Sequence, residues 1–198
     1  MGTRHLIAVV LDGEYKVAQY GQWDGYLTGQ GNAILKFLGQ LGGDDNLACF
    51  EKNLRRCKFI TDSDIIRFRE DENSQETKQF IDFADRDIGS KILYFIRDYE
   101  LDETIYLRDS ITFGADSLFC EYAYVIDLDN KVLEVYTGFN RSPIDSSERF
   151  ASIPPETDGY YQVKLFSKYN FSELPENFKA IEDKINENYE NSLTDEVE

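Results

Sequence analysis

The chain has 198 residues, of which 41% are hydrophobic and 14% aromatic, and its formal net charge is −17 at pH 7. This length and composition predict one globular domain over residues 1–190, with an acidic flexible tail over 191–198. The negative charge argues against a nucleic-acid partner, because such interfaces need clustered lysine and arginine. The sequence contains no apolar run of roughly 18 residues, the length that a membrane span needs, so we expect no membrane role.

The cysteines and the N-terminus indicate a reducing compartment. Cys49, Cys57 and Cys120 form no CxxC pair, which favours free structural thiols. The opening stretch "MGTRHLIAVVLDGEYK" has only a short apolar run and no small-residue cleavage site, so it predicts a strand and not a signal peptide. We therefore expect a cytoplasmic protein.

The first predicted elements are a hairpin and two helices. Residues 4–11 and 15–20 flank an Asp-Gly turn, which is a strong signal for a β-hairpin. Apolar residues at helical spacing predict a helix over 30–41, and two glycines end it. A second helix is expected in "DDNLACFEKNLRRC", where acidic residues suit the positive N-terminal end. Residues 58–73 fit either a short strand or turns.

The second half of the chain changes from helical to strand-like patterns. Residues 74–99 predict two helices separated by a turn near "DRDIGS". Strands are then predicted in the β-branched and aromatic stretches "TIYLRDS", "SLFCEYAYVIDL", "KVLEVYTGF" and "YYQVKLF". The "DLDN" between the second and third of these is typical of a tight hairpin turn. Residues 140–159 predict a polar surface loop, and a final helix is expected over roughly 175–190.

This order of elements predicts an α+β fold. We expect a mainly antiparallel sheet in which the hairpin of 4–11 and 15–20 joins strands from 119–137 and 160–166. A helical middle and a C-terminal helix complete the fold.

The stretch "VAQYGQWDGYLTGQGNAIL", residues 17–35, is the best candidate for a binding site. A glycine-flanked turn at a helix N-terminus presents N–H groups and the positive end of the helix dipole to a phosphate or carboxylate. The aromatic side chains can stack on a flat ring, and the amide and carboxylate groups can bind its polar edge. The expected ligand-binding residues are Arg4, Gln19, Tyr20, Gln22, Trp23, Asp24, Tyr26, Gly29, Gln30 and Gly31. The alternative is structural: Trp23 and the tyrosines cap the core while the glycines form a tight turn.

Other chemistry-bearing residues favour structural interpretations. His5 is the only histidine, so it would have to act alone in a catalytic or metal site, and we expect it on a half-buried strand face. The "DLDN" stretch has no further ligands at calcium-loop spacing. Arg108 and Asp109 favour a surface ion pair over a contribution to a pocket. We therefore expect no catalytic set, no metal and no cofactor.

Two stretches carry a family resemblance. "MGTRHLIAVVLDGEYKVAQYGQWDGY…GQG" and "EYAYVIDLDNKVLEVYTGF" (121–139) resemble a group of uncharacterised small proteins of phages, bacteria and fungi. Leu27 stands where such proteins are expected to have proline. The resemblance implies no chemistry. If the protein is phage-encoded, it would act in the host cytoplasm, and sequestering a host nucleotide signal as an anti-defence protein becomes an attractive hypothesis by analogy.

Three functional classes follow from these patterns. The first is a binding protein that captures a nucleotide-like anionic small molecule without chemistry. The second is an amide hydrolase of the N-terminal-nucleophile type, which would require processing to expose Thr3. The third is a protein-interaction module that uses the aromatic hairpins or the acidic tail. An oligomer is compatible with each of them.

Overall fold

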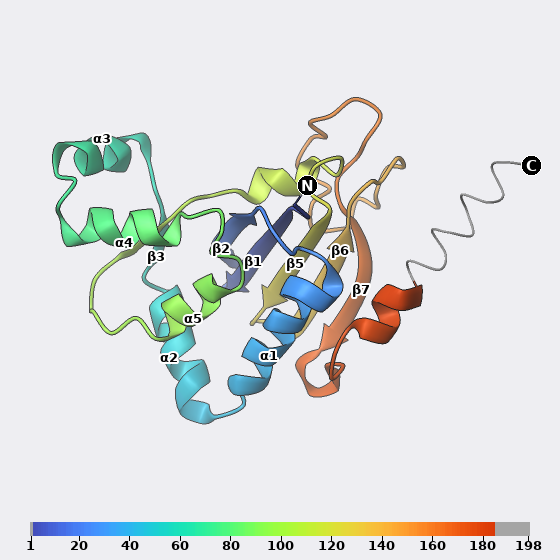
Figure 1. Ribbon diagram of the computed structural model, residues 1–198, viewed down its shortest axis with the longest axis horizontal. Coiled ribbons are helices and arrows are strands. Elements are labelled where there is room, and N and C mark those ends of the chain that lie inside the picture. Colours follow the sequence, from blue (N-terminus) through green and yellow to red (C-terminus); the bar gives the residue numbers. More distant parts are fainter. Residues whose placement is uncertain (1, 185–198) are drawn as a thin grey trace, which may run out of the picture.

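The computed structural model describes residues 2–184 of the chain and has an α+β fold (Figure 1). Its main sheet has five strands in the order β2-β1-β5-β6-β7, and most neighbouring pairs are antiparallel. The predicted fold class is confirmed. The expected tail over 191–198 lies outside the described residues. The strands are β1 (His5–Leu11), β2 (Glu14–Gly21), β5 (Tyr122–Asp127), β6 (Val132–Thr137) and β7 (Lys164–Asn170).

The first hairpin forms as its turn sequence predicts. Asp12 and Gly13 both have positive φ values, 57° and 75°, the conformation of the tight turn whose twist matches that of the flanking strands. Their N–H groups donate to the carboxylate of Asp129 at 2.9 and 2.8 Å. Asp129 belongs to the turn between β5 and β6, so the two hairpin turns are tied together.

The centre of the sheet departs from a purely antiparallel arrangement. β1 pairs with β5 in parallel, with His5 beside Tyr122 and Val10 beside Asp127. Residues 22–121 leave the sheet at the end of β2 and return to start β5, and a parallel pair requires a long crossover of this kind. A second, two-stranded parallel sheet pairs β3 (Cys57–Phe59) with β4 (Ile105–Leu107).

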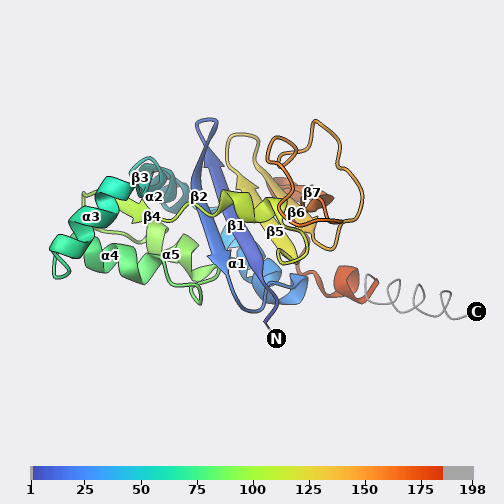
Figure 2. The ribbon, with the colours of Figure 1, turned by 90° about the horizontal axis from the view of Figure 1, so that it is seen from above.

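The crossover supplies the helices that cover one face of the sheet. Ile7, Val9, Tyr124 and Ile126 point to that face and pack in one cluster with apolar residues of the helices. Figure 2 shows the smaller sheet and the helices around it gathered on the β2 side of the main sheet. The helices of the crossover are α1 (Asn32–Gln40), α2 (Asp44–Leu54), α3 (Asp62–Glu70), α4 (Gln75–Phe83) and α5 (Lys91–Arg97).

These bounds confirm the predicted helices at 30–41 and 44–57 and the two helices within 74–99. Residues 58–73, which fitted two alternatives, form the end of β3 and helix α3. Thr61 begins α3 with a capping box: its hydroxyl accepts the Asp64 N–H, and the Asp64 carboxylate accepts the Thr61 N–H. Of the expected C-terminal helix, residues 179–184 are helical, and 185–190 lie outside the described residues. None of the helices in the described part is long and apolar enough to cross a membrane.

The opposite face of the sheet is covered by the segment 138–163. Leu6, Ala8 and Val125 pack there against Phe150 and Val163. The last strand lies later than the predicted 160–166, because Tyr161 and Val163 donate their N–H groups to the carbonyls of Asn140 and Gly114 and not to a strand. β7 begins only at Lys164, where pairing with Thr137 of β6 begins.

Candidate functional site

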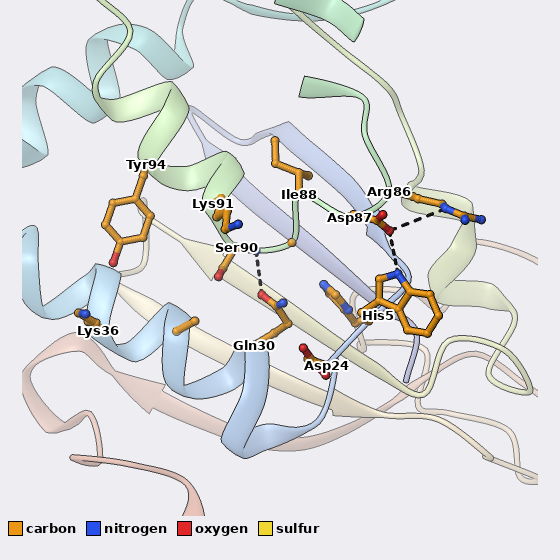
Figure 3. A pocket seen from close by; sticks show the side chains of 13 residues that line it. His5, Asp24, Gln30, Lys36, Arg86, Asp87, Ile88, Ser90, Lys91 and Tyr94 are labelled. Atoms are coloured by element: carbon orange, nitrogen blue, oxygen red, sulfur yellow. Dashed lines mark hydrogen bonds and ion pairs between the residues drawn. The ribbon is translucent and has the colours of Figure 1, made fainter. Parts of the chain in front are cut away.

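A polar pocket of about 620 Å³ lies where the first hairpin ends and the crossover begins. Three parts of the crossover and the first residue of β1 meet there. In Figure 3, Gln30 and Lys36 lie on the α1 side and Ser90, Lys91 and Tyr94 lie on the α5 side, while His5 and Asp24 lie beyond Gln30, toward Arg86 and Asp87. The lining residues are His5, Trp23, Asp24, Gln30, Ala33, Lys36, Arg86, Asp87, Ile88, Gly89, Ser90, Lys91 and Tyr94.

The turn after β2 brings Trp23 and Asp24 to the pocket. Asp24 adopts a left-handed conformation, with φ 57°, which a short polar side chain tolerates better than most. The next residue, Gly25, is held from both sides: its N–H donates to the Thr3 carbonyl at 2.9 Å, and its carbonyl accepts the Tyr124 hydroxyl at 2.8 Å. The turn is therefore fixed on the end of the sheet.

Trp23 is held at its nitrogen while much of its ring stays accessible. The indole Nε1–H donates to Asp87 Oδ1 at 2.8 Å, and Asp87 also lies 3.8 Å from the guanidinium Nε of Arg86. The side chain of Trp23 is nevertheless 46% exposed. Trp23 is not a member of the hydrophobic core clusters that the structure shows.

The short π-helical segment η1 (Leu27–Gly31) sets Gln30 against the loop before α5. The Gln30 N–H donates to the Asp24 carbonyl at 2.8 Å, and its side-chain Oε1 accepts the Ser90 N–H at 2.8 Å. Gly89 has a φ of +50°, and a Cβ there would lie 2.6 Å from Gln30 Nε2. Glycine at position 89 is thus needed for its backbone conformation and for the space that the Gln30 amide occupies.

Residues 85–90 are held at the end of β2 by two glutamines. The Gln22 N–H donates to the Arg86 carbonyl at 3.0 Å, and the Gln19 amide donates to the Asp85 carbonyl at 3.2 Å. These bonds place Arg86 and Asp87 next to the Trp23 turn, although more than 60 residues separate the two segments in sequence.

The charges around the pocket differ in sign from the chain as a whole. Lys36, Arg86 and Lys91 face Asp24 and Asp87 there, in a chain whose net charge is −17. Neither Lys36 nor Lys91 has an ion-pair partner among residues 2–184. The pocket therefore carries an excess of positive charge, and its two lysines are open to an added anion.

His5 is the most buried polar group of the pocket. It is 1% exposed, and burial lowers the pKa of its imidazole to about 4, with the neighbouring Thr3 backbone offsetting only part of this effect. The ring is neutral at physiological pH. Our sequence interpretation of His5 as a half-buried strand residue missed both its full burial and its place in a pocket.

Five of the ten residues predicted to bind a ligand lie in or beside the pocket. Trp23, Asp24 and Gln30 line the pocket, and Gln19 and Gln22 hold the loop beside it. Tyr26 is 38% exposed, with its hydroxyl 3.5 Å from Asp24.

Arg4 and Tyr20 lie on the other face of the sheet and are not brought to the pocket. The Arg4 guanidinium packs over the Phe119 ring at 4.6 Å and lies 3.7 Å from Glu121. Tyr20 packs edge-on against Phe113. Side chains of successive strand residues point to opposite faces, so neighbours of His5 and Gln19 in the sequence point away from the pocket.

The glycine-flanked turn uses its N–H groups within the protein. Gly29 and Gly31 donate to the Tyr26 carbonyl, and Thr28 donates its N–H and hydroxyl to the carboxylate of Glu182. Gly31 is buried against Phe178 and Tyr124. The expected nest at Gly29-Gln30-Gly31 therefore does not present these N–H groups to the pocket, and the carboxylate at this helix start comes from the chain itself.

The lining residues missed by the sequence are Lys36, Tyr94 and the loop from Arg86 to Lys91. The polar stretch "DRDIGS" predicted only a turn between helices. Its proximity to Trp23 arises from the crossover, which local patterns do not encode.

The other candidate chemistries find little support at this pocket. The cysteines are free, as predicted, and none of them lines the pocket; burial raises the pKa of the Cys57 thiol to about 12. Thr3 is half-buried and is not a lining residue either. Within the described residues, no group of three or more His, Cys, Asp and Glu side chains could hold a metal ion. Comparison of the chain with models of protein families, with curated proteins and with solved structures gave no match.

Proposed function

We propose that the protein captures a nucleotide-like anionic small molecule in the polar pocket. The observation that carries this proposal is the combination of an accessible indole with lysines that have no ion-pair partner among the described residues, in an otherwise acidic chain. A pocket of about 620 Å³ lies within the range of small-molecule sites, roughly 300–1,000 Å³.

The ring of the ligand would stack on Trp23. The hydrogen bond from the Trp23 Nε1–H to Asp87 fixes the indole, so little side-chain freedom is lost when the ligand ring packs against it. Stacking is tolerant of the identity of the base because every base has a π-face. This supports a class of ligand, a planar heterocycle, and not one particular base.

The anionic part of the ligand would be bound by Lys36 and Lys91, which project from α1 and α5, with Arg86 beside Asp87. Lysine ammonium groups bind phosphate as point charges and need no fixed orientation. Capture without turnover would suit a protein that sequesters a nucleotide-derived signal in the host cytoplasm.

Ligand capture from an extract tests this proposal. Untagged protein is incubated with a cytosolic extract, recovered by gel filtration and denatured, and the released small molecules are identified by mass spectrometry. We expect a phosphorylated heterocycle in stoichiometric amount, and a strongly reduced amount from Trp23→Ala protein treated in parallel. Release of no anionic heterocycle, or of equal amounts from both proteins, would contradict the proposal.

A further inference from the structure

The His5 side chain occupies a space that two glycines leave for it. Gly21 is the cross-strand partner of His5, and a Cβ at Gly21 would overlap the imidazole ring at Cε1 and Nε2. A Cβ at Gly25 would lie 2.8 Å from the Cβ of His5 and 3.0 Å from Nδ1. Neither glycine has a positive φ, so both are needed for space and not for backbone conformation. The chain thus sets a histidine into a fitted slot at the pocket.

Neither nitrogen of this ring makes a hydrogen bond of normal geometry in the part of the chain that the structure describes, and the contact with the Thr3 backbone that partly offsets the lowering of the imidazole pKa does not reach that geometry. Buried polar groups are almost always paired, and an unpaired one costs its full desolvation free energy. A phenylalanine ring would fill the slot without that cost. An unpaired imidazole that lines a pocket therefore calls for a partner that enters the pocket.

The polar groups that have no partner in the pocket define the chemistry of the ligand that would bind there. The neutral imidazole offers one donor and one acceptor. Gln30 Oε1 already accepts the Ser90 N–H, whereas Gln30 Nε2 has no hydrogen-bond partner among residues 2–184. The charged groups that line the same pocket are Asp24, Asp87, Lys36, Arg86 and Lys91. A neutral donor–acceptor set suits a neutral ligand edge, whereas a phosphate needs the cations.

We propose that His5 and Gln30 form a base-reading subsite, which hydrogen-bonds to the neutral donor and acceptor edge of a heterocyclic base while Lys36 and Lys91 bind its phosphate. This inference rests on the proposed function and narrows it. The ligand must carry a hydrogen-bonding heterocycle. A sugar phosphate or free phosphate would contact only the lysines and not His5 and Gln30.

The chain offers two unique reporters for a test, because it contains one histidine and one tryptophan. In untagged, ¹⁵N-labelled full-length protein, the imidazole nitrogens report on His5 and the indole N–H reports on Trp23. The probes are AMP, GMP, CMP and UMP, followed by ribose 5-phosphate and inorganic phosphate, each titrated to millimolar concentration. We expect at least one nucleotide to move both signals, and the two phosphates without a base to leave the imidazole signals unchanged.

The two reporters separate failure of the subsite from failure of the pocket. If a nucleotide moves the indole signal while the imidazole signals stay in place, the subsite is overturned and the proposed function stands. If none of the four nucleotides moves either signal, the proposed function itself is overturned, and the subsite falls with it.

Two substitutions of His5 give an independent measure. His5→Phe fills the slot without hydrogen bonds, and His5→Gln keeps a neutral donor and acceptor. For a nucleotide that moves both signals, we expect His5→Phe to weaken binding about tenfold, which corresponds to about 1.4 kcal/mol. His5→Gln should lose less, and ribose 5-phosphate should bind both variants as it binds the wild type. Equal nucleotide affinity of wild type and a folded His5→Phe protein would overturn the subsite.

Discussion

The two faces of the central sheet carry two polar clusters, one with its charges paired and one with several groups unpaired. The first, which we call the ionic cluster, consists of Asp127, Glu134, Tyr136, Arg149 and Lys168 and lies under the segment 138–163. The second is the polar pocket, where neither nitrogen of His5 makes a hydrogen bond of normal geometry and the ammonium groups of Lys36 and Lys91 have no partner among the described residues.

The ionic cluster satisfies its own hydrogen-bonding groups. Arg149 Nε donates to Glu134 at 2.6 Å and its Nη2 donates to Asp127 at 2.8 Å, while Lys168 and the Tyr136 hydroxyl also donate to Glu134, at 3.1 and 2.9 Å. This arrangement ties the segment that bears Arg149 to strands β5, β6 and β7. A closed cluster of this kind stabilises the fold, whereas the open groups of the pocket gain their partners only from a ligand.

Removing Arg149 from the ionic cluster is expected to have the largest effect on stability. Arg149→Ala leaves the buried carboxylate of Asp127 without a cation and leaves Glu134 with only Lys168 and the Tyr136 hydroxyl as partners. Breaking a buried ion pair in this way costs about 3–5 kcal/mol. Urea unfolding of the variant measures this loss. Arg55→Ala is the matched control, because the Arg55–Asp12 pair is about half exposed and solvent screens it, so its loss should cost much less. Equal losses in the two variants would show that the ionic cluster does not stabilise the fold.

The pH dependence of stability separates the two clusters. The folded-state pKa of His5, about 4, lies below its ordinary value of 6.5, so the unfolded chain binds more protons between these values. Stability is therefore full above pH 6.5 and falls as the pH is lowered to 4, by on the order of 3 kcal/mol. Urea unfolding between pH 7 and pH 5 measures the first part of this loss of stability. In His5→Phe protein, the stability should no longer fall over this pH range.

The ionic cluster should respond only at lower pH. Burial alone would raise the pKa of both Asp127 and Glu134. Hydrogen bonds outweigh this effect, from Asn130 and Arg149 to Asp127 and chiefly from Arg149 to Glu134. Both pKa values are therefore lowered. Their contribution is present above the ordinary values of 3.8 and 4.5 and is lost as the pH falls further. A His5→Phe protein that still lost stability between pH 7 and 5 would contradict the assignment of this range to His5.

Substituting the glycine beneath the imidazole tests whether the slot is fitted to His5. Gly21→Ala should cost about 1–3 kcal/mol, the usual range for overpacking, because the new methyl group overlaps the ring. In a His5→Ala background the same substitution should cost almost nothing, since alanine suits a strand better than glycine does. Urea unfolding of the four proteins gives the coupling energy. Additive effects would mean that the ring does not occupy this slot.

Truncating Trp23 should affect binding more than stability. Trp23→Ala is expected to weaken binding of a nucleotide by about 1–3 kcal/mol, the range for base–aromatic stacking. The loss of folding stability should be smaller than the roughly 3–5 kcal/mol of a buried tryptophan, because the side chain is 46% exposed. Phe119→Ala, a similarly exposed aromatic on the other face, should leave the affinity unchanged. Calorimetry in which both variants bind like the wild type would exclude stacking on Trp23.

The sequence predicts these regions well where neighbouring residues decide the structure, and poorly where residues far apart in the chain decide it. The Asp12-Gly13 turn and the helix starting with Asn32 follow from short patterns, and both formed where expected. The parallel pairing of β1 with β5 depends on residues more than 100 positions apart and has no local signature.

The candidate site illustrates the same limit. Trp23, Asp24 and Gln30 were found because they lie within one polar stretch, whereas Lys91 reaches the pocket only through the fold. His5 stood out in the sequence as the only histidine, but the predicted hairpin ended at residue 20, and the pairing of His5 with Gly21 follows from a register shift between Val9 and Val10. The two unpaired nitrogens of His5 can also be seen only when the surrounding atoms are placed.

The most direct test of the central claim is the affinity of a charge-reversed pocket. Lys36→Glu/Lys91→Glu is compared by calorimetry with Lys78→Glu/Lys164→Glu, whose lysines are exposed but do not line the pocket. Both double variants lower the net charge equally, so non-specific electrostatic effects are matched. With a nucleotide that binds the wild type, the account predicts loss of measurable binding for the first variant and near-wild-type affinity for the second. Equal affinities for the two folded variants would contradict it.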